Sequence, residues 1–88
     1  MSRLSEEGKR RRARLMTKIE AETLMDILMF IRERKYPPSL RDLGDLAGVT
    51  PQAIRYRVMN LDRKGYLEVD LGVSRGIRVT EKGRRAFL

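Results

Sequence analysis

The chain has 88 residues, of which 41% are hydrophobic, and its 20 basic and 12 acidic side chains give a formal net charge of +8. Eighty-eight residues predict one small domain, and a mean hydropathy of −0.50 without a long apolar run excludes a membrane-spanning helix. Cysteine and histidine are absent, which excludes disulfides, Cys/His zinc sites and the commonest general base. No apolar segment suits a secretory signal. We therefore expect a cytoplasmic protein that is not an enzyme, needs no metal or cofactor, and has nucleic acid as its partner.

The first 16 residues are predicted to form a basic arm that precedes the folded domain. Five of the six residues at positions 9–14 are basic: Lys9, Arg10, Arg11, Arg12 and Arg14. Such a block repels itself and does not fold alone. We leave three interpretations open: an arm that contacts phosphates or lies in a DNA groove, a solvated tail, or an N-terminal extension of the first helix.

A first helix is expected over residues 18–34, because Thr17 and Glu20 have the spacing of a capping box. Its inward stripe is predicted to consist of Leu24, Ile27, Leu28 and Ile31. Met25, Met29 and Phe30 lie beside or outside that stripe. We expect these three side chains to form a homodimer interface, and the alternative is that they pack under the C-terminal segment.

A second helix is predicted after the Tyr36-Pro37-Pro38 segment, which ends the first one because residues before proline avoid the α region. Ser39 and Asp42 form its capping box, and Gly48 ends it. The expected inward positions are Leu40, Leu43, Leu46 and Ala47. Gly44 lies inside this helix, where it either weakens the helix or permits close packing.

A third helix is predicted to start at Thr50, which caps it, and Pro51, which suits the first helical position. Gly65 ends it after two cations. Its apolar stripe comprises Ile54, Val58 and Leu61, and its outward face carries Gln52, Arg55, Tyr56, Met59 and Arg63. The short turn between the second and third helices is typical of a helix-turn-helix.

After Gly65 the apolar period changes from helical to alternating. Leu67, Val69 and Leu71 indicate one strand, and Ile77 and Val79 a second, separated by turn residues 72–76. The order helix, helix, helix, hairpin predicts an α+β, mainly α, winged helix-turn-helix domain over residues 17–80. Residues 81–88 form a C-terminal segment with a possible short helix.

From Tyr36 onward the chain resembles the winged-helix DNA-binding domain of LexA-type repressors, and more distantly MarR- and PadR-type regulators. The shared features are PPS before the second helix, the exit LDRKGYL of the third, and SRGIR in the wing. The resemblance implies a repressor that binds a two-fold operator as a dimer through its third helix. LexA repressors also carry a self-cleaving serine–lysine protease domain, for which these 88 residues leave no room, so self-cleavage is not implied.

The expected partner is double-stranded DNA, read by the third helix in the major groove. The residues predicted to contact bases are Thr50, Gln52, Ala53, Arg55 and Tyr56. Those predicted to contact the backbone or minor groove are Lys9, Arg10, Arg11, Arg12, Arg14, Arg41, Lys64, Arg75 and Arg78. LexA has acidic residues where Arg55 and Tyr56 stand, so its operator sequence cannot be carried over. The alternatives are a non-specific nucleic-acid-binding protein, including one that binds RNA, and a protein-interaction module.

Overall fold

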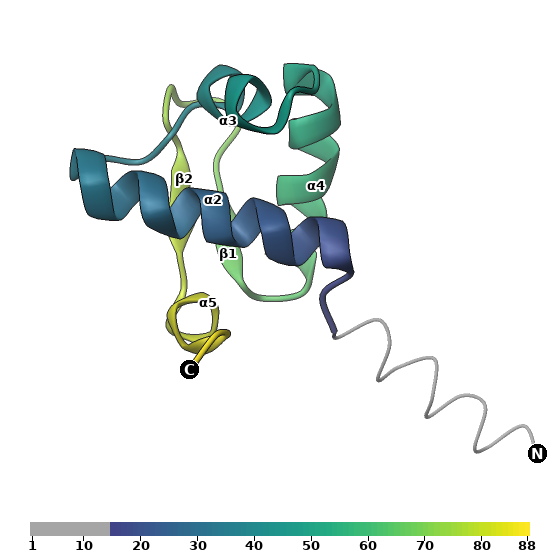
Figure 1. Cartoon of the computed structure of the whole chain (residues 1–88), viewed down its shortest axis with the longest axis vertical. Coiled ribbons are helices and arrows are strands. Elements are labelled where there is room, and N and C mark those ends of the chain that lie inside the picture. Colours follow the sequence, from purple (N-terminus) through teal and green to yellow (C-terminus); the bar gives the residue numbers. More distant parts are fainter. Residues whose placement is uncertain (1–14) are drawn as a thin grey trace, which may run out of the picture.

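Helices and one hairpin make up the described part of the chain, residues 15–88 of a computed structural model. The elements are α2 (Lys18–Arg34), α3 (Leu40–Ala47), α4 (Pro51–Arg63), β1 (Leu67–Val69), β2 (Ile77–Val79) and α5 (Glu81–Arg85). In Figure 1, α2 crosses in front of the two strands, α3 and the N-terminal end of α4 lie above it, and α5 lies below. This arrangement confirms the predicted winged helix-turn-helix.

Side-chain caps fix where the helices begin, as the sequence predicted. The Thr17 hydroxyl accepts from the Glu20 N–H at 3.1 Å and the Glu20 carboxylate accepts from the Thr17 N–H at 3.0 Å. Ser39 and Asp42 form the same reciprocal pair, with both distances 3.0 Å. At the end of α2 the chain turns through Lys35, which has a φ of 67°, so the helix stops before the residues of the predicted Tyr-Pro-Pro breaker.

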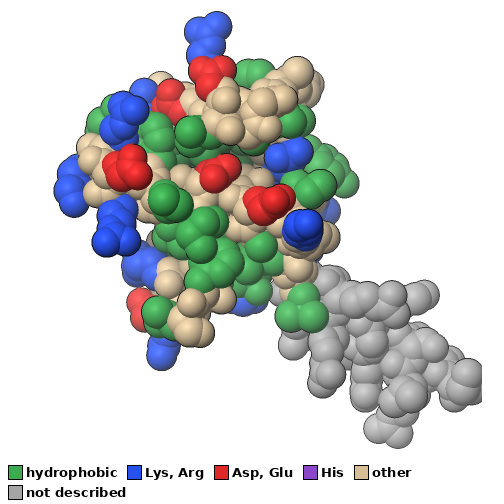
Figure 2. Space-filling model, in the orientation of Figure 1, with side chains coloured by type: hydrophobic (Ala, Val, Ile, Leu, Met, Phe, Trp, Pro, Cys, Tyr) green, Lys and Arg blue, Asp and Glu red, His purple; other side chains and the backbone are tan. Residues whose placement is uncertain are grey.

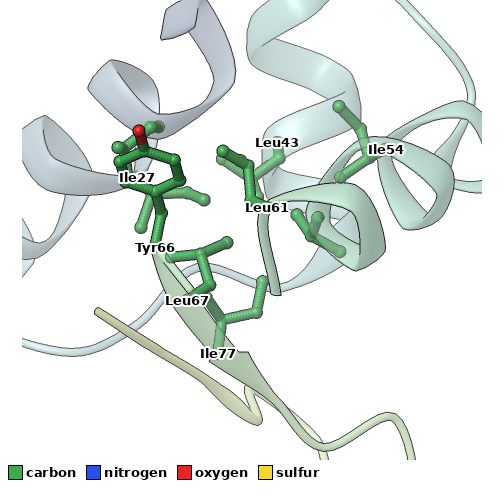
Figure 3. Close-up of a cluster of buried hydrophobic side chains, with 9 residues drawn as sticks. Ile27, Leu43, Ile54, Leu61, Tyr66, Leu67 and Ile77 are labelled. Carbon is green, nitrogen blue, oxygen red and sulfur yellow. The ribbon is translucent and has the colours of Figure 1, made fainter. Parts of the chain in front are cut away.

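The core lies where α2, α3, α4 and the hairpin meet, and Figure 3 shows its side chains converging there. Its buried members are Leu24, Ile27, Leu43, Ile54, Val58, Leu61, Tyr66, Leu67 and Ile77. The α4 stripe of Ile54, Val58 and Leu61 is fully buried, as predicted. Burying an aliphatic side chain of this size contributes about 1.5–3 kcal/mol, so the core decides which face of α4 is left outward.

The turn between α3 and α4 depends on close backbone contact at Gly44. A Cβ placed there would lie 2.7 Å from the Val49 carbonyl oxygen, so close packing is the reason for this glycine. Gly48 then takes a φ of 70° and Val49 packs against the core. One expectation is wrong: Leu46 is 60% exposed and Ala47 is also exposed, because α3 is short and its last turn passes beyond the core.

The wing is an antiparallel pair in which Leu67 lies opposite Val79 and Glu68 opposite Arg78. The strands are shorter than predicted, because β1 ends at Val69 and Leu71 lies in the connecting loop, where it is exposed. The Asp70 N–H donates to the Gly76 carbonyl at 2.8 Å. A Cβ at Gly76 would lie 2.2 Å from the Asp70 carbonyl oxygen, so glycine is needed where the loop closes.

The possible C-terminal helix is confirmed as α5, which packs on β2. Gly83 is buried inside it, and a Cβ there would lie 2.2 Å from the Tyr66 carbonyl oxygen. The Thr80 hydroxyl accepts from the Gly83 N–H at 3.1 Å and donates to the Gly65 carbonyl at 2.6 Å. Ala86 packs against the core, whereas Phe87 and Leu88 are exposed.

Candidate nucleic-acid interface

The outward face of α4 brings together the side chains predicted to contact bases. Gln52, Arg55 and Tyr56 are all exposed, and Tyr56 is 70% exposed. The Arg55 side chain forms no ion pair or hydrogen bond with any residue between 15 and 88. Long donors on a helix face that no part of the fold uses can reach base edges in a major groove.

The other two predicted base contacts, Thr50 and Ala53, lie at the start of α4. The Thr50 hydroxyl accepts from the Ala53 N–H at 3.1 Å, so it caps the helix. Ala53 itself is half-buried. Thr50 is thus the N-cap of α4 and Ala53 lies in its first turn, the turn that recognition helices present to the DNA.

The predicted backbone contacts separate into free and engaged side chains. Arg41, at the start of α3, is exposed, and so is Arg78 on β2, whose guanidinium lies 3.8 Å from the Glu68 carboxylate across the hairpin. Residues 9–14 lie outside the described residues. Lys64 and Arg75 are both held by other parts of the fold.

Lys64 connects the end of α4 to the start of α2. Its Nζ lies 2.6 Å from the Glu20 carboxylate and donates to the Leu15 carbonyl at 2.9 Å. Burial opposes the charge on Glu20, but its hydrogen bonds from Lys64 and Thr17 outweigh that cost and lower its pKa. The Lys64 side chain is only 17% exposed and is held by Glu20 and Leu15, and its role as a phosphate contact stays a prediction.

Arg75 is folded back from the wing onto the junction between α2 and α3, and is not a free wing tip. Its Nη1 donates to the Asp42 carboxylate at 2.8 Å and to the Pro37 carbonyl at 2.9 Å. Its guanidinium also lies over the Tyr36 ring, 4.8 Å from the centroid. The backbone of Arg75 has a φ of 57°, in the left-handed region.

Sequence reasoning missed the residues that support the wing. Asp42 was predicted only as part of a helix cap, yet the Ser39 N–H and the Arg75 guanidinium together lower its pKa. The Asp62 carboxylate accepts from the Val69 N–H at 2.8 Å and so ties α4 to β1. The capping-box spacing signalled one Asp42 bond, but nothing local in the sequence signals partners that lie far along the chain.

The residues predicted to form a dimer interface remain uncovered by the C-terminal segment. Met25 and Met29 are exposed and Phe30 is half-buried. Met29 and Phe30 also line a surface hollow of about 420 Å³ between α2 and α3. The alternative, that they pack beneath residues 81–88, is therefore wrong for both methionines.

Across residues 15–88, no helix has the length and apolar character to span a membrane. The same residues contain no group of three or more Asp or Glu side chains placed to hold a metal ion.

Comparison with known proteins gives a consistent result. The LexA DNA binding domain family matches residues 13–76. The LexA repressor of Oleidesulfovibrio alaskensis is 32% identical over 66 residues, which is 75% of this chain and 32% of that protein. The LexA repressors of Thermobifida fusca and Mycobacterium bovis are 34% and 36% identical, over 73% and 65% of this chain and 26% and 25% of theirs. The chain thus spans about a third or less of these relatives, and it belongs to the LexA DNA-binding domain family.

Proposed function

We propose that this chain is the DNA-reading part of a transcriptional repressor that binds a two-fold operator as a dimer, with α4 in the major groove. The observation that carries the proposal is the outward face of α4, where Gln52, Arg55 and Tyr56 are exposed. Relatives that share 32–36% of the matched residues are named LexA repressors. Such a function places the protein in the cytoplasm, at the nucleoid.

Sequence readout is assigned to Arg55 and Gln52 in this proposal. An arginine pairs bidentately with guanine O6 and N7, and a glutamine with adenine N6 and N7. Thr50 and Ala53 are placed to contact a thymine methyl, and Tyr56 a phosphate or sugar. Because Arg55 and Tyr56 stand where LexA has acidic residues, the LexA operator is not carried over to this chain.

Affinity is assigned mainly to phosphate neutralisation by residues 9–14, Arg41 and Arg78. If a dimer makes about 6–10 phosphate contacts, binding falls by roughly 10³ to 10⁵ between 50 and 200 mM salt. These contacts position the protein but carry little sequence information.

Random-site selection on duplex DNA, followed by binding assays on the selected site, tests the function. We expect one motif with two-fold symmetry. Arg55→Ala should then cost about 1–3 kcal/mol on that site and relax the preference at one base pair. Arg85→Ala is the matched control, because it removes the same charge from α5, which packs on β2.

Three results would contradict the proposal in distinguishable ways. Equal losses on all sequences for Arg55→Ala would remove its base-reading role. A steep salt slope with no preferred sequence, or with equal binding to single-stranded RNA, would indicate a general nucleic-acid binder. No binding to any nucleic acid would indicate a protein-interaction module.

A further inference from the structure

One face of α2 is exposed along its whole length. Five side chains at alternating spacings of four and three residues lie on it, which we call the outer stripe: Lys18, Glu22, Met25, Met29 and Arg32. On a helix with 3.6 residues per turn they fall within an arc of about 80°. The buried residues Leu24 and Ile27 lie on the opposite side. Within residues 15–88, therefore, no other segment covers the outer stripe.

The centre of the outer stripe is apolar and its two ends are charged. Met25 is 38% exposed and Met29 is 51% exposed, and methionine is the apolar side chain that adapts most readily to a second surface. Figure 2 shows hydrophobic side chains gathered on the face that α2 crosses, with acidic side chains among them and basic ones toward the edges. Glu22 and Arg32 form no ion pair with any residue of the described range, 15–88.

The order of these residues is self-complementary. In an antiparallel pair of α2 helices whose two-fold axis crosses the outer stripe at the level of residue 27, residues equally far from position 27 oppose each other. Met25 then lies against the partner's Met29, and Glu22 against the partner's Arg32. Each contact occurs twice, which is the property of an interface between identical surfaces. A spacing of alternating fours and threes is also the spacing at which two helices pack along their length.

We propose that the outer stripe of α2 is the surface on which a second copy of this chain packs antiparallel, with Met25 and Met29 at its centre and Glu22–Arg32 ion pairs at its ends. This deepens the dimer of the proposed function and rests on it. The 17 residues of α2 give a contact of about 26 Å at 1.5 Å per residue. Two methionine pairs and two exposed ion pairs make a reversible dimer, since exposed ion pairs contribute little to association.

The direction of the axis agrees with binding to one DNA duplex. The two-fold axis of an antiparallel pair is perpendicular to α2 and lies in the contact surface between the two outer stripes. In Figure 1, α3 and the N-terminal end of α4 lie on the same side of α2. Rotation about such an axis keeps both elements on that side in the second copy, so the two recognition helices can address the same duplex.

A charge-reversal experiment on the full 88-residue chain, without DNA, tests whether Glu22 lies opposite Arg32 in the dimer. We expect sedimentation equilibrium between 1 μM and 1 mM to show the wild type passing from 10.3 kDa to twice that mass. Glu22→Arg places two arginines opposite each other and Arg32→Glu two glutamates, so each variant alone should dimerise about tenfold more weakly or worse. An equimolar mixture of the two variants should associate again, because every Arg then faces a Glu.

Restoration in the mixture cannot arise from a change within one copy, which makes it the decisive result. Arg85→Glu, on α5, is the matched control and should leave the dimer constant unchanged, because Arg85 is exposed and lies outside the outer stripe. Circular dichroism should show all variants folded. A wild type that stays monomeric at 1 mM, or single reversals that the mixture does not rescue, would overturn the proposal. Gel shifts on a half-site separate this result from the DNA-binding function, because monomeric variants should still bind the half-site with the wild-type affinity.

Discussion

The Arg75 guanidinium of the wing lies 2.8 Å from the Asp42 carboxylate of α3, and this contact joins the hairpin to the helix-turn-helix. The same carboxylate accepts from the Ser39 N–H and thereby caps α3. One acidic group thus sets both the start of α3 and the position of the wing. An arginine that the sequence assigns to DNA is, in the unbound protein, part of the scaffold.

Asp42→Asn distinguishes a scaffolding Arg75 from a phosphate-binding one. Asparagine keeps an oxygen for the Ser39 N–H but removes the charge that holds Arg75. If Arg75 positions the wing, the variant should bind DNA several-fold more weakly, although it has lost a negative charge, and its salt slope should stay unchanged. Stronger binding to DNA would show that Asp42 competes with phosphate for Arg75.

Arg75→Ala gives the complementary measurement. Loss of a positioning contact should cost about 1 kcal/mol of stability and weaken binding to all DNA sequences alike, with no change in the salt dependence. Loss of a phosphate contact would instead reduce the salt slope by about one. Gel shifts at four salt concentrations, beside urea unfolding, separate the two outcomes.

The pair of Lys64 and Glu20 should contribute to stability. Lys64→Ala leaves a largely buried carboxylate without its partner, so we expect a loss on the order of 3 kcal/mol in urea unfolding. The double variant Glu20→Gln with Lys64→Met removes both charges and should be closer to the wild type than Lys64→Ala is. If both variants are equally unstable, the charge pair is not the reason for the loss.

Acid should destabilise the protein through the same carboxyl groups. The pKa of Glu20 lies below its ordinary value of 4.5 and that of Asp42 below 3.8. A lowered carboxyl pKa stabilises the folded state above the ordinary value, and the contribution disappears as the pH falls through the lowered value. Unfolding free energies should therefore fall below about pH 4.5, less steeply in Glu20→Gln. A curve that is flat down to pH 3 would contradict this.

Gly83→Ala sets helix propensity against packing. Alanine favours a helix by about 1 kcal/mol over glycine, yet its Cβ would meet the Tyr66 carbonyl oxygen at 2.2 Å. We expect packing to dominate and the variant to lose about 1–3 kcal/mol. Gly72→Ala is the control, since its Cβ would come no closer than 3.4 Å to a flexible Asp70 carboxylate. A more stable Gly83→Ala protein would refute the close contact.

Local chemistry made most of the fold predictable from the sequence. Capping pairs such as Thr17 with Glu20 act over three residues, and the α4 stripe follows from helical period alone. The Lys64–Glu20 and Arg75–Asp42 contacts join residues 44 and 33 positions apart, and no periodic signal records such pairs. For this reason the exposed residues of α4 were identified, whereas two of the basic residues assigned to DNA were not recognised as parts of the scaffold.

Leu46 shows the other limit of sequence reasoning. Its spacing matched the buried stripe of α3, but whether an apolar position is covered depends on how far the neighbouring elements extend. Here α3 ends at Ala47 and its last turn lies outside the core. The helical period predicts on which side of a helix a residue lies. Whether that residue is buried depends on how far the neighbouring elements extend.

Residues at the C-terminal end of α4 contact three other elements of the fold. Asp62 accepts from the first wing strand, Lys64 pairs with α2, and the Lys64 carbonyl accepts from Lys82 of α5 at 2.7 Å. Three segments, β1, α2 and α5, are thus attached to the end of α4. The loop of residues 71–74, before Arg75, makes none of these three contacts. A longer loop between positions 71 and 74 would therefore leave all three contacts in place, so the length of the wing can change while α4 keeps its position in the fold.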